Sequence, residues 1–126
     1  MNLLFVGLGG ALGAMARYLV GAQSLRAFGP GWPYGTFTVN VVGGLLMGTL
    51  AGWLAHRGAV DQDRWRLLLG VGVLGGFTTF SAYSLELALM IERREYMPAA
   101  GYAAASSLFA VGAVFIGLFA ARRLFA

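Results

Sequence analysis

The chain has 126 residues, of which 59% are hydrophobic and only 11% are charged, with 20 glycines and no cysteine. A soluble domain usually carries about 25% charged residues, so this composition excludes a soluble globule, and the lack of cysteine excludes disulfides and thiolate metal sites. The formal net charge of +4 comes from scattered arginines, which suit the flanks of membrane spans better than a nucleic-acid surface. We therefore expect an all-α membrane protein with no nucleic-acid partner.

Long windows without charge predict four transmembrane helices in a single domain, residues 1–126. A helix needs roughly 20 apolar residues to cross the hydrocarbon core of a bilayer. The expected helices cover about residues 3–25, 34–55, 65–91 and 98–121. Short connections at residues 29–33, 57–63 and 92–97 separate them. The first helix begins without a basic region or a small-residue cleavage site, so we do not expect it to be a removable signal peptide.

The arginines are divided almost evenly between the two sides of the membrane, so they specify the orientation of the chain only weakly. Four spans place both termini and the second connection on one side, which then holds Arg57, Arg64, Arg66, Arg122 and Arg123. The other side holds Arg17, Arg26, Arg93 and Arg94. Because orientation follows the excess of Lys and Arg on the cytoplasmic side, five against four predicts insertion in both orientations; the alternative is a weak bias toward cytoplasmic termini. A four-helix chain this small does not readily enclose a pathway alone, so we expect an oligomer.

Glycines recur at a four-residue spacing in the first three helices. The pairs are Gly9-x-x-x-Gly13, Gly44-x-x-x-Gly48 and Gly72-x-x-x-Gly76. Helices in lipid associate through small residues that let their backbones approach closely. These pairs therefore predict tight helix packing and say nothing about chemistry.

Polar residues at membrane depth are costly and often mark the path of an ion or a substrate. Arg17, near the outer end of the first helix, either extends to the lipid headgroups or gives an anion vestibule a permanent positive charge. Asn40 lies one turn after Thr36 in the second helix. Taken alone, Asn40 is better explained as a hydrogen bond to a neighbouring helix, worth about 1 kcal/mol.

The centre of the third helix reads Gly-Gly-Phe-Thr-Thr-Phe-Ser over residues 75–81. Two glycines followed by two threonines form a poor helix interior, so we expect a break near the midplane. Unwound backbone at that depth is tolerated where it is buried or lines a polar site, and its free carbonyls are ligands for a cation. An antiparallel two-fold axis through the break would combine two carbonyls from each chain.

Aromatic and hydroxyl side chains follow this break. Phe80 and Tyr83 share a helical face with Ser81 adjacent, and the fourth helix adds Tyr102 and Ser106 one turn apart. Aromatic pairs at this spacing usually pack, but the positive edge of an aromatic ring can also favour an anion. The inventory of amide, hydroxyls and ring edges suits a small anion.

Three motifs in the chain follow the pattern of a known family. They are Gly-Gly-Ala-Leu-Gly-Ala-Met-Ala-Arg-Tyr over residues 9–18, Gly-Thr-Phe-Thr-Val-Asn-Val-Val-Gly over residues 35–43, and residues 75–81. They resemble the Fluc (CrcB) fluoride channels, and with length and span number the resemblance covers essentially the whole chain. It implies an antiparallel, dual-topology homodimer in the lipid bilayer of a prokaryotic inner membrane. It further implies two pores that passively export cytoplasmic fluoride, giving fluoride resistance, and a structural sodium ion at the dimer interface.

The resemblance also assigns residues by position. The sodium ligands resemble the backbone carbonyls of Gly75 and Thr78 from both subunits. The implied fluoride pathway consists of Asn40, Phe80, Tyr83, Ser81, Tyr102, Ser106, Thr36 and Arg17. Within it, Asn40 resembles the pore amide and Phe80 the first ring of an aromatic box. The chain departs from the family at Tyr83, where a phenylalanine is usual, and at Ala110, where a serine is common.

Other functions are open to a chain of this kind. Small multidrug transporters also have four helices, dual topology and roughly this length, but their proton coupling needs an acid in the first helix. The first helix here contains no acid, and Glu86 in the third helix is the remaining candidate. A purely structural membrane subunit is a further alternative. An enzyme is least expected, because no nucleophile with its base and no metal-ligand set is visible.

Overall fold

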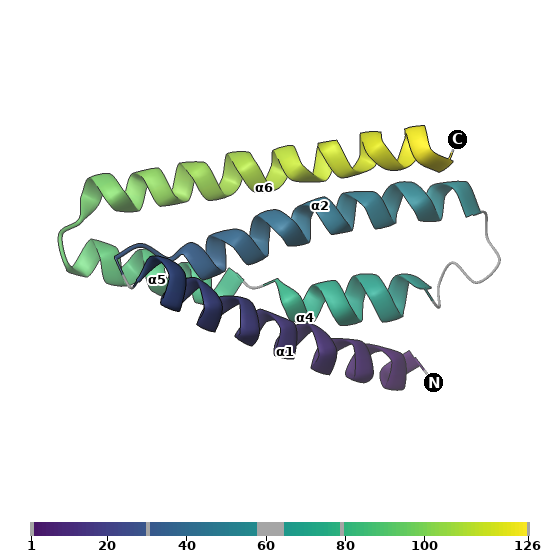
Figure 1. The fold of residues 1–126 in the computed structure, drawn as a ribbon, viewed down its shortest axis with the longest axis horizontal. Helices are drawn as coiled ribbons and strands as arrows, with labels where there is room; N and C mark the ends of the chain where they lie inside the picture. Colours follow the sequence, from purple (N-terminus) through teal and green to yellow (C-terminus); the bar gives the residue numbers. More distant parts are fainter. Residues whose placement is uncertain (1, 30, 58–64, 79, 126) are drawn as a thin grey trace.

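The computed structural model describes residues 2–29, 31–57, 65–78 and 80–125, and within these ranges its regular structure is entirely helical (Figure 1). The elements are α1 (Asn2–Phe28), α2 (Tyr34–Arg57), the π-helix η1 (Arg66–Leu74), α4 (Gly75–Phe77), α5 (Phe80–Glu92) and α6 (Tyr96–Phe125). Four stretches of the described chain are apolar and long enough to cross a membrane: Asn2–Phe28, Tyr34–Ala55, Arg66–Glu92 and Tyr96–Leu124. The predicted all-helical chain with four membrane-length helices is confirmed.

The helix ends differ from the expected ones by a few residues. Helix α1 continues to Phe28, and α6 begins at Tyr96, before Pro98 rather than at it. A proline in the first turn of a helix is tolerated because its missing N–H has no partner there anyway. The expected second connection, residues 57–63, lies outside the described residues except for Arg57, which belongs to α2.

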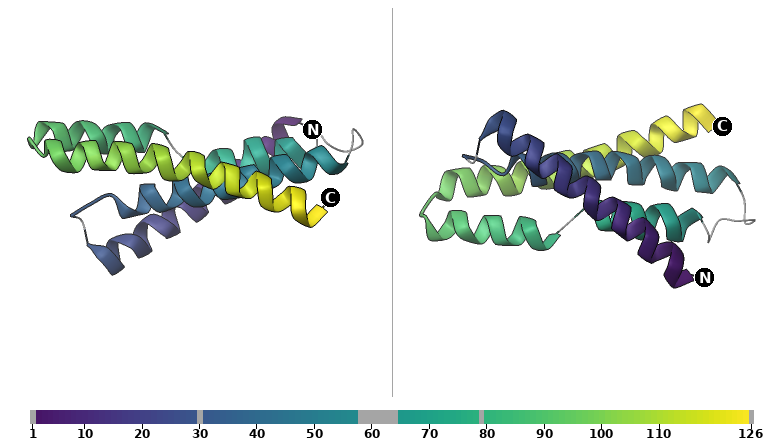
Figure 2. Two further views of the ribbon diagram at one scale, coloured as in Figure 1. Left: turned by 90° about the horizontal axis from the view of Figure 1, so that it is seen from above. Right: turned by 60° about the horizontal axis from the view of Figure 1, so that its bottom comes forward.

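The spans form two packed pairs. Helices α2 and α6 lie side by side along much of their length (Figure 1), and α1 crosses the first part of the third span at an angle (Figure 2). The beginning of α1 and the end of α6 lie at the same end of the bundle, as four spans require. The connections that follow α1 and α5 lie at the other end.

The backbones of α2 and α6 approach so closely that only glycine fits at their contact. A Cβ atom added at Gly44 would lie 2.7 Å from the carbonyl oxygen of Ala110. A Cβ atom at Gly117 would lie 2.6 Å from the amide nitrogen of Thr49, and one at Gly48 would overlap the carbonyl group of Val114. The predicted packing role of the glycine pair in α2 is confirmed.

Helix α1 packs on the third span in the same way. A Cβ atom at Gly9 would lie 2.5 Å from the carbonyl oxygen of Leu68, and one at Gly76 would lie 2.5 Å from that of Gly10. The small residues of both helices thus face each other, as their spacing predicts. This contact holds only η1 and α4, so the first half of the third span is fixed more firmly than α5.

The first half of the third span is wound as a π-helix, which the sequence does not predict. At its end, the amide of Gly75 donates to the carbonyl oxygens of Gly70, five residues back, and Gly72. Such wider turns are rare and frequently occur at functional sites. Its sequence, Arg-Leu-Leu-Leu-Gly-Val-Gly-Val-Leu, lacks the polar residues that would mark a helical period.

The third connection ends α5 with a left-handed residue. Arg94 has φ 62°, its amide donates to the carbonyl oxygen of Ile91, and the amide of Glu95 donates to that of Met90. This is the pattern of a Schellman motif, in which glycine is the usual left-handed residue. The reversal places Arg93 and Glu95 together at the end of the bundle, where their side chains form an ion pair at 2.7 Å.

The glycine contact between α2 and α6 makes a testable prediction on stability. Gly117→Ala adds a methyl group against the backbone of α2 and is expected to lower the free energy of unfolding by about 1–3 kcal/mol. Gly112→Ala is the matched control, because a Cβ atom there meets nothing within 4 Å. Thermal unfolding of both purified variants in detergent measures the difference. Equal midpoints for the two variants would contradict the close backbone contact.

Candidate functional site

Thr78 lies between α4 and α5 with an extended backbone. Its φ and ψ are −85° and 157°, and both its amide and its hydroxyl donate to the carbonyl oxygen of Leu74 at 2.9 Å. Residue 79 lies outside the described residues, and α5 begins at Phe80. The hydroxyl of Thr78 thus caps the end of α4. The backbone of Thr78 itself is extended rather than helical.

Residues from three helices meet in one cavity of about 380 Å³ next to Thr78. Asn40 comes from α2, Phe80 and Tyr83 from α5, and Ser106 from α6. The structure therefore brings together four of the residues that the sequence analysis assigns to one pathway. Of the helices that carry them, α2 and α6 are held in register by their glycine contact one turn further along.

The aromatic side of this cavity is open. The side chain of Phe80 is 77% exposed, and its ring centroid lies 5.4 Å from that of Tyr83. Ser81, on the same turn of α5, is also exposed. A single chain thus builds one wall of a passage and leaves the other side uncovered.

The hydroxyl groups of Tyr102 and Ser106 are buried without a hydrogen-bond partner in the part of the chain that the structure describes. The side chain of Tyr102 is completely buried, and that of Ser106 is 6% exposed. A buried polar group without a partner typically costs about 1–3 kcal/mol. Both hydroxyls belong to one face of α6, and Ser106 lines the cavity, where its hydroxyl can donate to a ligand.

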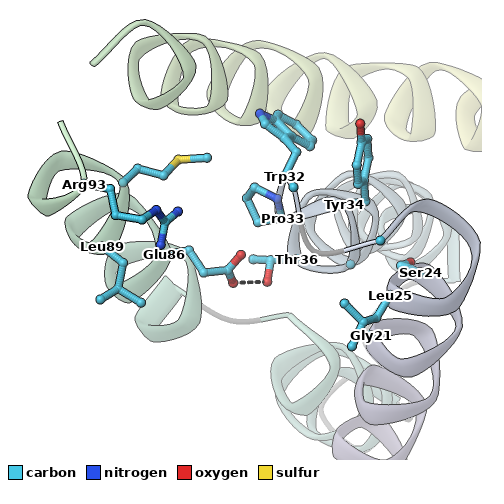
Figure 3. Close-up of a pocket in the computed structure, with 14 residues that line it drawn as sticks. Gly21, Ser24, Leu25, Trp32, Pro33, Tyr34, Thr36, Glu86, Leu89 and Arg93 are labelled. Atoms are coloured by element: carbon cyan, nitrogen blue, oxygen red, sulfur yellow. Dashed lines mark hydrogen bonds between the residues drawn. The ribbon is translucent and has the colours of Figure 1, made fainter. Parts of the chain in front are cut away.

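Thr36 lines a different cavity, of about 350 Å³, at the end of the bundle. Its hydroxyl donates to the carboxylate of Glu86 across the cavity (Figure 3). Trp32 lines the same space from the first connection, and Arg93 lines it from the end of α5. Although Thr36 precedes Asn40 by only one turn, the two residues face separate cavities.

Arg17 is packed against the third span. Its Nε donates to the carbonyl oxygen of Gly76 at 3.3 Å, and its side chain is partly buried. It also lines a third cavity, of about 400 Å³, together with Thr36. This position favours the interior placement of Arg17 over the expected alternative of a side chain extended to the headgroups.

Glu86 and Trp32 line one of these cavities but are absent from the pathway that the sequence predicts. Glu86 is a single acid in an apolar window, which is a signal for a buried polar partner, but only the structure identifies that partner as Thr36. Trp32 stands between glycine and proline in a turn. A large aromatic side chain in such a short connection is the one sequence feature that indicates packing of this residue onto the helices.

Comparison with known proteins gives consistent results. A family model described as CrcB-like protein, Camphor Resistance (CrcB), matches residues 4–118. A fluoride-specific ion channel FluC of Phenylobacterium zucineum is 68% identical over 124 residues, which is 98% of each chain. The FluC of Caulobacter vibrioides is 64% identical over 125 residues, covering 99% of this chain and 98% of the relative. The FluC of Hyphomonas neptunium is 53% identical over 123 residues.

The unpartnered hydroxyl of Tyr102 makes a prediction on stability that can be checked in detergent. Tyr102→Phe removes a buried polar group without a partner, so we expect the free energy of unfolding to stay constant or to rise by about 1 kcal/mol. Thr36→Val is the contrasting variant, because it leaves the carboxylate of Glu86 without its donor and should lower that free energy by about 1–3 kcal/mol. A Tyr102→Phe protein that unfolds as early as Thr36→Val would show that the hydroxyl of Tyr102 has a stabilising partner.

Proposed function

The chain belongs to the CrcB-like protein family, and we propose that it is a passive, fluoride-selective channel that exports fluoride from the cytoplasm. The relatives named above are ion channels rather than enzymes, and the chain is a multi-pass protein of the bacterial inner membrane. The observation that carries the proposal is the cavity beside Thr78, which combines an amide, two aromatic rings and a buried hydroxyl without a partner.

The chemistry of this cavity matches a small anion. Fluoride leaves water only if hydrogen-bond donors replace its hydration shell, and the amide of Asn40 and the hydroxyl of Ser106 in this cavity are such donors. Tyr102, whose ring packs on Tyr83 at the cavity wall, carries a further hydroxyl. The rings of Phe80 and Tyr83 add positive edges without adding a charge. The phenol at Tyr83 keeps the ring edge that the usual phenylalanine would provide. Neutral donors and ring edges attract an anion without holding it as tightly as a fixed positive charge would.

A passive channel is enough to remove fluoride from a cell. Hydrogen fluoride crosses membranes as a neutral molecule, dissociates in a near-neutral cytoplasm and leaves the fluoride anion trapped. The negative-inside membrane potential then drives the anion out wherever an anion-selective path exists. No proton coupling is required, which separates this function from that of a drug antiporter. The relatives named above likewise give no support to that alternative.

We infer that the working unit is an antiparallel homodimer with two pores, and that the third span is broken where the two copies meet. The extended backbone of Thr78 supports the break, and the exposed ring of Phe80 supports a second copy that covers the open side of the cavity. Antiparallel pairing requires both orientations in the membrane. Five arginines stand on the side of the termini and four on the other, so charge specifies orientation only weakly, as insertion in both orientations requires.

A structural sodium ion at the centre of the dimer is part of the same proposal. The carbonyls of Gly75 and Thr78 would hold it, two from each copy, and uncharged carbonyl oxygens are ligands that sodium accepts. Gly75 is exposed on the single chain, as a residue that faces a partner must be. Arg17 donates a hydrogen bond to the carbonyl oxygen of Gly76, and the hydroxyl of Thr78 donates one to that of Leu74. These two side chains therefore do not occupy the carbonyl oxygens of Gly75 and Thr78 that would bind the ion. When bound, the ion would join the two chains at the ends of their α4 helices.

Fluoride efflux from liposomes tests the proposed function directly. Vesicles that contain the purified chain should release fluoride and retain chloride. Asn40→Ala should slow fluoride efflux by at least about a hundredfold, because the anion loses a donor that replaces bound water, a loss of about 3 kcal/mol of stabilisation. An ion-selective electrode records the efflux.

Thr49→Ala is the matched control on the same helix. Its hydroxyl donates to the carbonyl oxygen of Leu45 within α2 and lies away from the cavity, so efflux should stay within twofold of the unchanged chain. Normal efflux from a folded Asn40→Ala protein would remove this amide from the pathway. A chain that releases no fluoride at all would refute the channel itself.

Orientation is tested by moving charge. Lysines added after Phe125 should place most chains with their termini in the cytoplasm. Such a chain should lose fluoride resistance when it is expressed alone, because it lacks an oppositely oriented partner. A copy with lysines added beside Arg93 and Arg94 should restore resistance when both are expressed together.

Accessibility of a C-terminal tag in the same cells shows the orientation of each chain. Before charge is added, the tag should be accessible from both faces of the membrane. If a chain with a single proven orientation still gives full resistance alone, the antiparallel dimer is wrong.

A further inference from the structure

The ring of Tyr102 lies between the linings of two cavities. Its centroid is 5.2 Å from that of Tyr83, which lines the cavity with Asn40, and 5.1 Å from that of Trp32, which lines the cavity with Thr36. The Tyr102 side chain has no exposed surface. The ring of Tyr102 thus contacts one lining residue of each cavity.

Ring contacts are the main restraint on the Tyr102 side chain. The hydroxyl of Thr36 lies close to that of Tyr102, but no hydrogen bond of ordinary geometry holds the Tyr102 hydroxyl in the described chain. The ring of Tyr83 is inclined to it by 49°, and the indole of Trp32 meets it nearly at right angles, at 80°. The perpendicular contact by Trp32 blocks movement of the phenol toward the end of the bundle.

Trp32 is itself held by the start of α2. Its carbonyl oxygen accepts the amide of Tyr34 at 2.8 Å, and its ring packs on those of Tyr34 at 5.0 Å and Phe37 at 5.2 Å. Figure 3 shows the indole above Pro33, directed from the first connection toward α6. A turn that contains glycine and proline is thus anchored by aromatic contacts on the helix that also carries Asn40.

We propose that Trp32 is a positioning residue that fixes the ring of Tyr102 and, through it, the direction of the hydroxyl offered to a passing fluoride ion. This inference rests on the proposed function. Removal of the indole leaves a space into which the phenol can swing, and the hydroxyl then no longer points along the passage between the two cavities. The role requires an aromatic wall at residue 32 but no hydrogen bond from it.

Liposome efflux of fluoride tests this role with three variants. Trp32→Ala should slow efflux by about tenfold, the rate equivalent of one lost aromatic contact. Trp32→Phe keeps a ring against Tyr102 and should remain within about threefold of the unchanged chain. Trp53→Ala is the control, because it removes the same side chain near the other end of α2, where it packs on Trp65 at 5.6 Å. It should leave efflux within twofold.

A double-mutant cycle with Tyr102→Phe separates positioning from a general structural effect. If Trp32 acts through the hydroxyl, Tyr102→Phe slows efflux and Trp32→Ala adds nothing further in that background. The protein-to-lipid ratio is raised until the slowest variant empties its vesicles, so that all four proteins give a rate. The unchanged chain in the same series shows whether the proposed function holds.

Three outcomes would overturn the inference while leaving the channel intact. The first is a Tyr102→Phe chain with unchanged efflux, because the hydroxyl would then have no role. The second is an additive loss in the double variant. The third is a Trp32→Phe chain as slow as Trp32→Ala, because an aromatic wall would then not be what matters.

Discussion

The close approach of α2 and α6 is the contact on which the rest of the site depends. Lipid offers little hydrophobic drive for helix association, so backbones that touch through Gly48 and Gly117 supply packing that larger side chains would prevent. One turn from Gly44 on α2 stands Asn40, and one turn before Ala110 on α6 stands Ser106. Because Gly44 meets Ala110 directly, the amide and the hydroxyl face the same cavity. A structural contact without chemistry of its own thus sets the spacing of the chemical groups.

The third span is held unequally along its length, and this explains why its second half depends on aromatic contacts. Glycines fix η1 and α4 to α1, whereas α5 follows the extended residue Thr78 and touches the other helices at few places. Its orientation relies on Met90, Leu87 and Tyr83, which pack in one cluster with Tyr102, and on the hydrogen bond between Glu86 and Thr36. A helix with so little backbone contact is well placed to gain its remaining support from a second copy of the chain.

Hydropathy and glycine spacing predict most of the fold, because a bilayer demands long apolar helices and close contacts need small residues. Polar and aromatic groups in an apolar window draw attention to Asn40, Phe80, Tyr83 and Ser106, but it is the family resemblance that assigns them to one pathway. The sequence does not predict the π-helix, whose residues are almost uniformly apolar, so that no face is marked. The sequence likewise does not predict the direction of the Arg17 side chain, because the position of a residue along a helix does not identify the neighbouring helix that its side chain contacts. The role of Trp32 is hidden for a related reason, because its glycine- and proline-containing turn predicts only a break between helices.

The unpartnered hydroxyls of Tyr102 and Ser106 connect stability with function. Each is held inside the protein at a cost of about 1–3 kcal/mol that an apolar side chain would avoid. A serine or tyrosine that only filled space could be replaced by alanine or phenylalanine without loss. The groups make physical sense if a ligand completes their hydrogen bonds, and an anion is the ligand that accepts from both. A conducted ion must also dissociate. Neutral donors that are oriented by packing therefore suit a channel better than a buried positive charge, which would hold the ion more tightly. Under the proposed function, the packing around Tyr102, rather than any ion pair, would set how well the passing ion is held.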